Sequence, residues 1–325
     1  MAKKYRLTPA ILDGAWDAFI GASPDGSVFI TSNYLKHTDC RLGLYRLYNN
    51  EEIRAVVAVV ESPDGTSAVL DDFVIYSGIC FGIISNGQSH AQRISERHEI
   101  ATFIAHSLED RYESIVFALS PSVEDIRPFL WHNFGKSERR FKVDIRYTSY
   151  LSIADFAFAS KLDDIETYRQ ATGARRQQIR YAIRDTIVTE EFQAVSIFID
   201  FYRRTMERQG ETVSAHKLDR LVLLLEALLS NGCAKLFYSR TSDGSVGSVA
   251  VFAFDTLRAY YLFGASDPDL RKTPMGTAIL WDSFTLLART GVMQVDLEGV
   301  NSPQRGWFKL SFGGSLVPYY QVALD

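Results

Sequence analysis

The feature that most constrains the fold of this chain is an order of predicted helices and strands that occurs twice. In the first half, the residue pattern predicts strands at 42–48, 53–60 and 67–75. The segments 49–50 and 63–65 between them are rich in Asn, Asp, Pro and Gly, which favours hairpin turns and an antiparallel meander. The second half predicts the same order of elements. The sequence therefore favours an α/β (α+β) fold with two domains of one topology.

The elements around the two meanders complete this repeated order. The first half has predicted helices at 9–20, 32–37, 96–110 and 123–133, a strand at 114–119 and an extended segment at 140–153. The second half has predicted helices at 168–184, 196–209 and 218–230, a meander at 234–240, 246–254 and 257–265, a helix at 275–290, a strand at 292–298, a short helix at 303–312 and a last strand at 316–324. We therefore expect domains at 1–150 and 151–325, with a cleft between or beside them. The last strand is a candidate to complete the first domain.

Composition argues against several classes of protein. The chain has 325 residues, of which 46% are hydrophobic, enough for a core in each of two domains. A formal net charge of -4 argues against a generally basic nucleic-acid binder, so DNA is not expected as a partner. No long apolar run predicts a membrane span, and the start of the chain lacks the apolar region of a signal peptide. We therefore expect a cytoplasmic protein.

Cysteine and histidine spacing predicts neither a disulfide framework nor a metal site. Cys40, Cys80 and Cys233 are far apart, which suits a reducing compartment. The six histidines form no zinc motif and no Ser–His–Asp spacing. The sequence therefore predicts no metal and no tightly bound cofactor.

The segment Asp296–Gly314 combines charged, polar and aromatic side chains with several glycines between two predicted strands. Glycine and polar residues at this density weaken regular structure. A fold tolerates such a segment most readily where the backbone bends around a ligand. We interpret the segment as one wall of an active site.

WFKLSFGG at 307–314 contains the pattern F-K-x-x-F-G-G. This stretch resembles the signature of the FemAB-like group of acyltransferases, whose members carry two GNAT-like domains in tandem. ARRQQIRYAIRD at 174–185 is similar to its R-R-x-I-R-x-A helix, and the stretch 260–284 is similar to a strand, loop and helix of its second domain. In the first half, Tyr76 and the glycine two residues later resemble a Y-x-G step near the acceptor site. The resemblance implies two tandem GNAT-like domains, each with a mixed, mostly antiparallel sheet flanked by helices.

The same resemblance implies transfer of an acyl group to an amine. Members of the group use aminoacyl-tRNA to build peptidoglycan bridges, or are linked to polysaccharide synthesis with acyl-CoA as the donor. We therefore expect an N-acyltransferase with acyl-CoA or aminoacyl-tRNA as co-substrate. The expected acceptor is an amine of a cell-envelope or polysaccharide precursor, such as an amino sugar. The alternative is a non-catalytic tandem GNAT fold that binds a nucleotide-sugar or a protein partner.

Lys309, Asp296 and Glu298 are the candidate catalytic residues. Lys309 lies between two apolar faces of the short predicted helix, so its ammonium can reach a phosphate or an oxyanion along an apolar wall. A surface lysine would show the same spacing. Asp296 and Glu298 alternate with apolar residues near the end of a predicted strand, which places both carboxylates on one face. Either can accept the proton of the amine, and a structural brace is the alternative.

The candidate loop for binding the donor contains Arg271, Gly276 and Thr277 at the start of a predicted helix. In GNAT enzymes the corresponding loop offers backbone N–H groups to a pyrophosphate. Pro274 replaces the first glycine of that pattern and has no N–H group to donate. The sequence therefore leaves the donor open, and this loop motivates the non-catalytic alternative.

Two further groups of residues are candidates for binding the substrate. Tyr261 and Ser266 flank a predicted break in the strand, where backbone amides could hold the reacting carbonyl. Arg176 and Arg180 belong to a basic stripe on a helix that could contact phosphates of the acceptor or of tRNA, although a solvated face shows the same pattern. The remaining candidates for binding the substrate are Tyr76, Arg127, Asn301 and Arg305.

Overall fold

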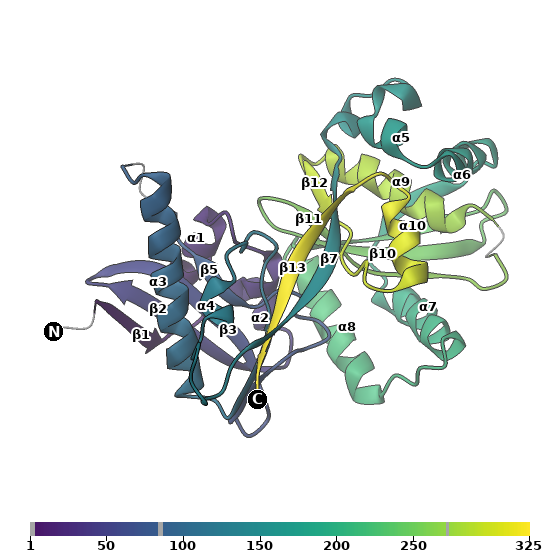
Figure 1. Ribbon diagram of the computed structural model, residues 1–325. Helices are drawn as coiled ribbons and strands as arrows, with labels where there is room; N and C mark the ends of the chain where they lie inside the picture. The colour runs from purple at the N-terminus through teal and green to yellow at the C-terminus, as the bar shows by residue number, and fades with distance from the viewer. Residues whose placement is uncertain (1–3, 84–86, 271–272) are drawn as a thin grey trace. The chain divides into compact units, whose positions relative to one another are not determined.

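The computed structural model describes residues 4–83, 87–270 and 273–325, and it divides into two compact units. The first unit takes in the chain up to Arg146 together with Pro318–Asp325, and the second is Tyr147–Val317. The chain passes from one unit to the other within two strands, β7 (Lys142–Ser152) and β13 (Ser315–Leu324). Figure 1 shows the chain with its helices and strands labelled.

The first unit is a mixed sheet flanked by helices. Its strands are β1 (Tyr5–Pro9), β2 (Arg41–Asn49), β3 (Glu52–Glu61), β4 (Ser67–Val69), β5 (Gly78–Phe81) and β6 (Ser114–Ala118). Its helices are α1 (Gly14–Ala22), α2 (Ser32–Leu35), α3 (His90–Glu109) and α4 (Arg127–Leu130), with a 3-10 turn at Val28–Ile30. Antiparallel pairing joins β1 to β2, β2 to β3, and β3 to both β4 and β5. β4 runs parallel to β6, and β6 is antiparallel to the end of β13.

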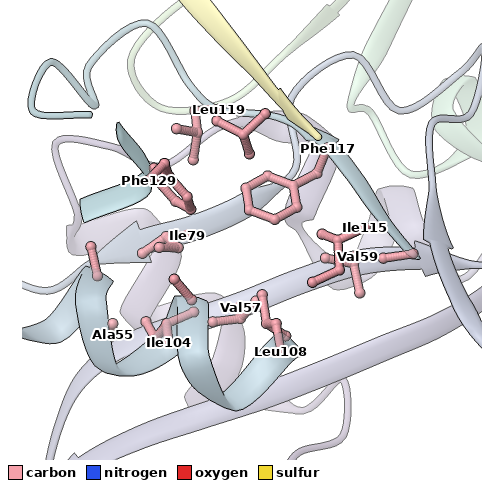
Figure 2. Packing of buried hydrophobic residues seen from close by; sticks show 14 of the residues in the cluster. Ala55, Val57, Val59, Ile79, Ile104, Leu108, Ile115, Phe117, Leu119 and Phe129 are labelled. Carbon is pink, nitrogen blue, oxygen red and sulfur yellow. The ribbon is translucent and has the colours of Figure 1, made fainter. Parts of the chain in front are cut away.

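Helix α3 packs on the sheet to form the core of the first unit. Ser89 and Gln92 form a capping box at its N-terminus, which satisfies backbone N–H groups that the helix leaves unpaired. Ile104 and Leu108, one turn apart on α3, are fully buried. Figure 2 shows both side chains facing Val57 of β3 within a cluster that β5 and β6 complete. Burial of each such side chain stabilises the unit by about 1.5–3 kcal/mol.

The start of the chain differs from the sequence prediction. The predicted helix at 9–20 begins only at Gly14, because the side chain of Asp13 caps it by accepting a hydrogen bond of 2.8 Å from the Trp16 N–H. The preceding residues form β1, which the sequence analysis did not predict. Pairing with β2 is a long-range contact, and the local pattern around Pro9 does not report it.

Two other segments of the first unit are shorter than predicted. The strand expected at 67–75 ends at Val69, and the separate strand β5 (Gly78–Phe81) pairs with β3 instead. The helix expected at 123–133 is reduced to Arg127–Leu130. In both cases part of the apolar segment is buried by tertiary packing without extending the regular element: Phe73 and Val74 in the first, Val123 and Phe129 in the second.

The second unit is another mixed, mostly antiparallel sheet with helices. Its strands, besides the end of β7, are β8 (Val188–Phe192), β9 (Ala234–Arg240), β10 (Val246–Phe254), β11 (Ala259–Ser266) and β12 (Gln294–Asp296). Its helices are α5 (Glu166–Gln170), α6 (Gly173–Arg184), α7 (Val195–Arg208), α8 (Ala215–Ser230), α9 (Met275–Ala288) and α10 (Pro303–Leu310), with 3-10 turns at Ala154–Ala157 and Leu162–Asp164. The strand order is β7-β12-β11-β10-β9-β8, and β11 runs parallel to β12. Helix α9 contributes Ile279, Leu280 and Phe284 to the core.

Strand β11 carries a bulge that matters for the candidate site. Val251 of β10 pairs with Phe263, and Phe252 pairs with Tyr261, so Leu262 is an extra residue on β11. The bulge breaks the two-residue alternation that the sequence prediction assumed for this strand. It therefore changes the direction of the side chains on either side of it.

Both units have the predicted fold class, a mixed and mostly antiparallel sheet flanked by helices. Along the stretches that the structure describes, no helix is both long enough and apolar enough to cross a membrane.

Candidate functional site

The second unit brings together the three candidate catalytic residues. Lys309 lies on α10, a helix that begins with Pro303 at its first position, where proline lacks only an N–H group that the helix would leave unpaired. The Lys309 ammonium donates a hydrogen bond of 2.9 Å to the backbone oxygen of Glu298 and lies 5.1 Å from the centre of the Tyr261 ring. Burial lowers the pKa of Lys309 from 10.5 to about 8, while the nearby Glu298 and Asp296 carboxylates act in the opposite direction.

Asp296 ends β12 and is fully buried. Its Oδ1 accepts hydrogen bonds from the Thr148 hydroxyl and, at 2.8 Å, from the backbone N–H of Glu298. One carboxylate oxygen is therefore used to fix the turn that follows the strand. These contacts favour the structural brace for Asp296 over the role of proton acceptor.

Glu298 lies just beyond the strand in a left-handed conformation, with φ of 49°. The predicted strand at 292–298 is therefore wrong at its end: β12 stops at Asp296, and the turn rather than the pleat directs the Glu298 side chain. This conformation costs a non-glycine residue about 1 kcal/mol or more. Backbone strain of this kind is often found at functional sites.

The Glu298 carboxyl is also buried without full compensation. The side chain is nearly inaccessible to solvent, and its Oε1 has no hydrogen-bond partner among the described residues. Burial raises the pKa of Glu298 well above its usual 4.5, and the Asp296 carboxylate raises it further. A carboxyl group with a raised pKa and one oxygen without a hydrogen-bond partner among the described residues, beside an ammonium, is suited to take up or deliver a proton.

The Tyr261 ring lies against the Lys309 ammonium. The same ring packs against Phe252 at a centroid distance of 5.3 Å, and its hydroxyl lies against Gly264. A Cβ atom at position 264 would lie 1.7 Å from that hydroxyl, so glycine is required for the close approach. Tyr261 is thus placed by the bulge and by Gly264, whereas Tyr260 is buried in the core and bonds to Asp255.

The N-terminus of α9 lies close to α10. Thr277 in its first turn is buried and accepts a hydrogen bond from Arg175 of α6. A Cβ atom at Gly276 would lie 3.6 Å from the Ser266 hydroxyl and 4.0 Å from the Phe308 ring, so these three residues are neighbours. Pro274 is the N-cap residue of the helix. Arg271, the remaining candidate of this loop, lies outside the described residues.

Arg175 is a residue of this site that the sequence analysis did not select. Its guanidinium lies over the rings of both Phe308 and Phe312, 4.4 Å from each centre, and the two rings meet edge-on. It also donates to the Ser311 hydroxyl at 2.9 Å. Burial lowers the pKa of Arg175 from 12.5 to about 10, with no carboxylate contributing to the shift. The signal in the sequence is its place four residues before the buried Ile179, on the apolar face of α6.

The remaining candidates of the second unit are more exposed or engaged with the fold. Ser266 hydrogen bonds to Ser248 at 2.8 Å, and Asn301 holds both the N–H and the carbonyl of Tyr147. Arg176 is half-buried on α6, next to Arg175. Two exposed arginines are paired with neutral groups: Arg180 with the Tyr168 hydroxyl and Arg305 with the Gln209 side chain.

Tyr76 and Arg127 lie in the first unit. Tyr76 is buried in an aromatic cluster with Phe29 and Tyr319. Arg127 forms a bidentate ion pair with Asp125, and its guanidinium lies over the ring of Trp131.

Comparison with known proteins agrees with the fold. Residues 168–305 match the model of the family described as "Acetyltransferase (GNAT) domain". No curated protein matches the sequence.

Several solved structures are similar along almost the whole chain. The crystal structure of FemX has a TM-score of 0.66 at 14% identity, covering 97% of this chain and 96% of that one. A tandem GNAT protein from the clavulanic acid biosynthesis pathway has a TM-score of 0.55 at 8% identity, covering 99% and 98%. L-PGS from Bacillus licheniformis has a TM-score of 0.53 at 13% identity, covering 96% and 91%. The expected tandem GNAT fold is confirmed: residues 168–305 match the model of a GNAT acetyltransferase domain, and the chain as a whole has the fold of FemX, L-PGS and the tandem GNAT protein.

Proposed function

We propose that the protein transfers an acyl group to an amine at the cluster formed by Lys309, Glu298 and Tyr261. The observation that carries this proposal is the pair of buried ionisable groups on a strained turn: a carboxyl with an unpartnered oxygen and an ammonium held 2.9 Å from the backbone oxygen of the same residue. Such an arrangement costs stability, so selection for a chemical role explains it better than selection for folding.

Glu298 is the proposed proton acceptor. An amine must lose a proton as its nitrogen attacks the acyl carbon, because the C–N bond forms while the bond from the acyl carbon to the donor's sulfur or oxygen breaks. The raised pKa of Glu298 brings its affinity for a proton closer to that of the amine, which attacks in its neutral form and gives up a proton as the C–N bond forms. The leaving group then takes up a proton, and the carboxyl group returns to its starting state.

Lys309 is the proposed group that stabilises the oxyanion. The tetrahedral intermediate carries a negative charge on the former carbonyl oxygen, and a preorganised cation in a water-poor site stabilises that charge strongly. The hydrogen bond to the Glu298 carbonyl and the face of the Tyr261 ring fix the ammonium in position. This role requires the protonated form of Lys309, whose pKa of about 8 keeps it mostly charged at pH 7.

The donor is proposed to be an acyl-CoA or an aminoacyl-tRNA, both of which carry phosphate groups. The buried Arg175 guanidinium and the N-terminal end of α9, which no side chain caps, supply positive electrostatic potential next to α10. For the acceptor we propose an amine of a cell-envelope or polysaccharide precursor, as the resemblance of the motifs at 174–185 and 307–314 to the FemAB-like group implies.

The test begins with thermal-shift screening of the intact protein against acyl-CoAs, charged tRNA and amino-sugar nucleotides, followed by turnover assays with the donor that binds. Lys309→Met keeps the length of the side chain and removes its charge. We expect kcat to fall about 100- to 1,000-fold, the usual cost of removing one oxyanion donor. Lys161→Met is the matched control, because Lys161 lies in the same unit with 72% of its side chain exposed.

The outcomes separate the alternatives. Equal turnover in the Lys309→Met and Lys161→Met variants would contradict the assigned role. Binding of a tRNA donor should weaken steeply as salt rises, which distinguishes it from an acyl-CoA. Tight binding of a precursor with no acyl product from any donor would instead favour the non-catalytic alternative.

A further inference from the structure

The first unit contains a cluster of metal-ligand side chains that the proposed acyl transfer does not use. His106 and Glu109 lie at the end of α3, three residues apart and so on one face of the helix. His132 follows α4, 23 residues after Glu109 in the sequence. One ligand atom from each of the three residues lies within 4.8 Å of the others.

The geometry of the cluster fits a small divalent metal ion. His132 Nε2 lies 2.8 Å and His106 Nδ1 lies 3.7 Å from the same oxygen, Glu109 Oε2. Ligand atoms about 2.0–2.1 Å from a tetrahedral zinc ion are separated by about 3.4 Å. The two distances bracket that value, so small rotations of the side chains would place all three atoms around one ion.

Neighbouring groups orient the ligands. Glu109 Oε1 lies 3.4 Å from the Asn133 side-chain nitrogen and 3.8 Å from Arg139 Nε, which leaves Oε2 turned towards the imidazoles. The His132 side chain is fully buried, and its ring packs edge-on against Phe141 at 5.1 Å. Such outer contacts fix ligand orientation in metal sites. The charge of Arg139 reduces the attraction for a cation, so we expect weaker binding than in a site with two free carboxylates.

We propose that His106, Glu109 and His132 bind a divalent transition metal ion of the zinc class, with a fourth position left for water. Two imidazole nitrogens and one carboxylate oxygen suit Zn²⁺ better than Mg²⁺ or Ca²⁺, which prefer oxygen ligands. The ion would join the end of α3 to the segment after α4. The sequence showed no zinc motif because one of the three ligands comes from a separate segment of the chain.

The experiment is a calorimetric titration of the intact, tag-free and metal-free protein with Zn²⁺, repeated with Co²⁺ and its visible absorption spectrum. We expect about one ion per chain, a rise in Tm with Zn²⁺, and a Co²⁺ spectrum of a four-coordinate site. His106→Ala and Glu109→Gln should each weaken Zn²⁺ binding about 100-fold. Loss of an outer contact in a metal site costs about 10- to 100-fold in affinity, and loss of a direct ligand should cost at least as much. His106 is half exposed, so the His106→Ala variant should fold even if a change at the buried His132 does not.

His98→Ala is the matched control, because His98 lies on the same helix and contacts Trp131 outside the cluster. Its affinity for Zn²⁺ should equal that of the unmodified protein. The proposal is overturned if the protein binds no Zn²⁺ at micromolar concentration. It is equally overturned if His106→Ala and Glu109→Gln bind as tightly as His98→Ala, which would locate the ion at other histidines or at thiols. Neither result depends on acyl transfer.

Discussion

Replacing Lys309 by methionine should make the protein more stable at pH 7 while it abolishes most turnover. Met has nearly the length of Lys without its charge, so it fits between the Tyr261 ring and the Glu298 turn. In the wild type, the free-energy cost of burying the Lys309 ammonium exceeds its attraction to the Glu298 and Asp296 carboxylates, as the lowered pKa of Lys309 indicates. Removal of the charge therefore relieves an unfavourable interaction of the folded state.

The size of the effect follows from the two pKa values. The pKa of Lys309 falls from 10.5 to about 8 on folding, and each unit of pKa shift corresponds to about 1.4 kcal/mol. The charge on Lys309 therefore lowers the free energy of unfolding by about 3 kcal/mol at pH 7. The folded protein binds fewer protons at this side chain than the unfolded chain, so its stability rises with pH between about 8 and 10.5. At pH 10 the charge on Lys309 lowers the free energy of unfolding by only about 1 kcal/mol. The advantage of Lys309→Met should shrink accordingly.

The assay is urea denaturation of the wild type, Lys309→Met and the control Lys161→Met at pH 7 and pH 10. We expect Lys309→Met to exceed the wild type by up to about 3 kcal/mol at pH 7 and by about 1 kcal/mol at pH 10. A loss of stability at pH 7 would refute the reasoning, because the ammonium would then be a structural brace. If Lys309→Met exceeds the wild type in the free energy of unfolding by the same amount at both pH values, the effect does not come from protonation of Lys309.

Four further outcomes are expected. The pH profile of kcat/KM should fall near pH 8 as Lys309 loses its proton, and Glu298→Gln should remove from the profile the ionisation that Glu298, with its raised pKa, contributes. Glu298→Gly should be more stable than Glu298→Ala by about 1 kcal/mol in urea denaturation, because only glycine adopts the left-handed conformation without strain; equal stability would contradict the strained turn. Gly264→Ala should lower kcat about 100-fold by displacing Tyr261, and an unchanged kcat would show that the ring does not position Lys309. Leu108→Ala should destabilise the protein by about 2–5 kcal/mol in the same denaturation assay, whereas a loss below 1 kcal/mol would contradict its place in the core.

Local patterns determined many of the elements that carry the candidate site. The predicted helix at 303–312 is α10 (Pro303–Leu310), and the predicted strand at 316–324 is β13 (Ser315–Leu324). The meander of the second unit appears as β9, β10 and β11 close to the predicted bounds. These elements have strong periodicity and clear turn signals, so neighbouring residues suffice to define them.

The sequence was less informative where a partner far along the chain decides the outcome. Strand β1 exists because it pairs with β2, and β5 because it pairs with β3. The bulge in β11 depends on its register with β10, so alternation alone misplaced the side chains around Tyr261. A short segment gains its strand conformation from hydrogen bonds that its own residues do not specify.

Local patterns in the sequence predicted the order of most elements, the mixed fold class and the polar segment that contains Lys309, because each depends on residues close together in the chain. The behaviour of those groups depends on the tertiary structure. It placed Glu298 in a left-handed turn with a buried oxygen that has no partner among the described residues, and it buried Arg175 against two aromatic rings. It also joined His132 to a helix that ends 23 residues earlier in the chain. Burial, electrostatic coupling and ligand geometry are properties of atoms brought together by folding, so no local pattern contains them.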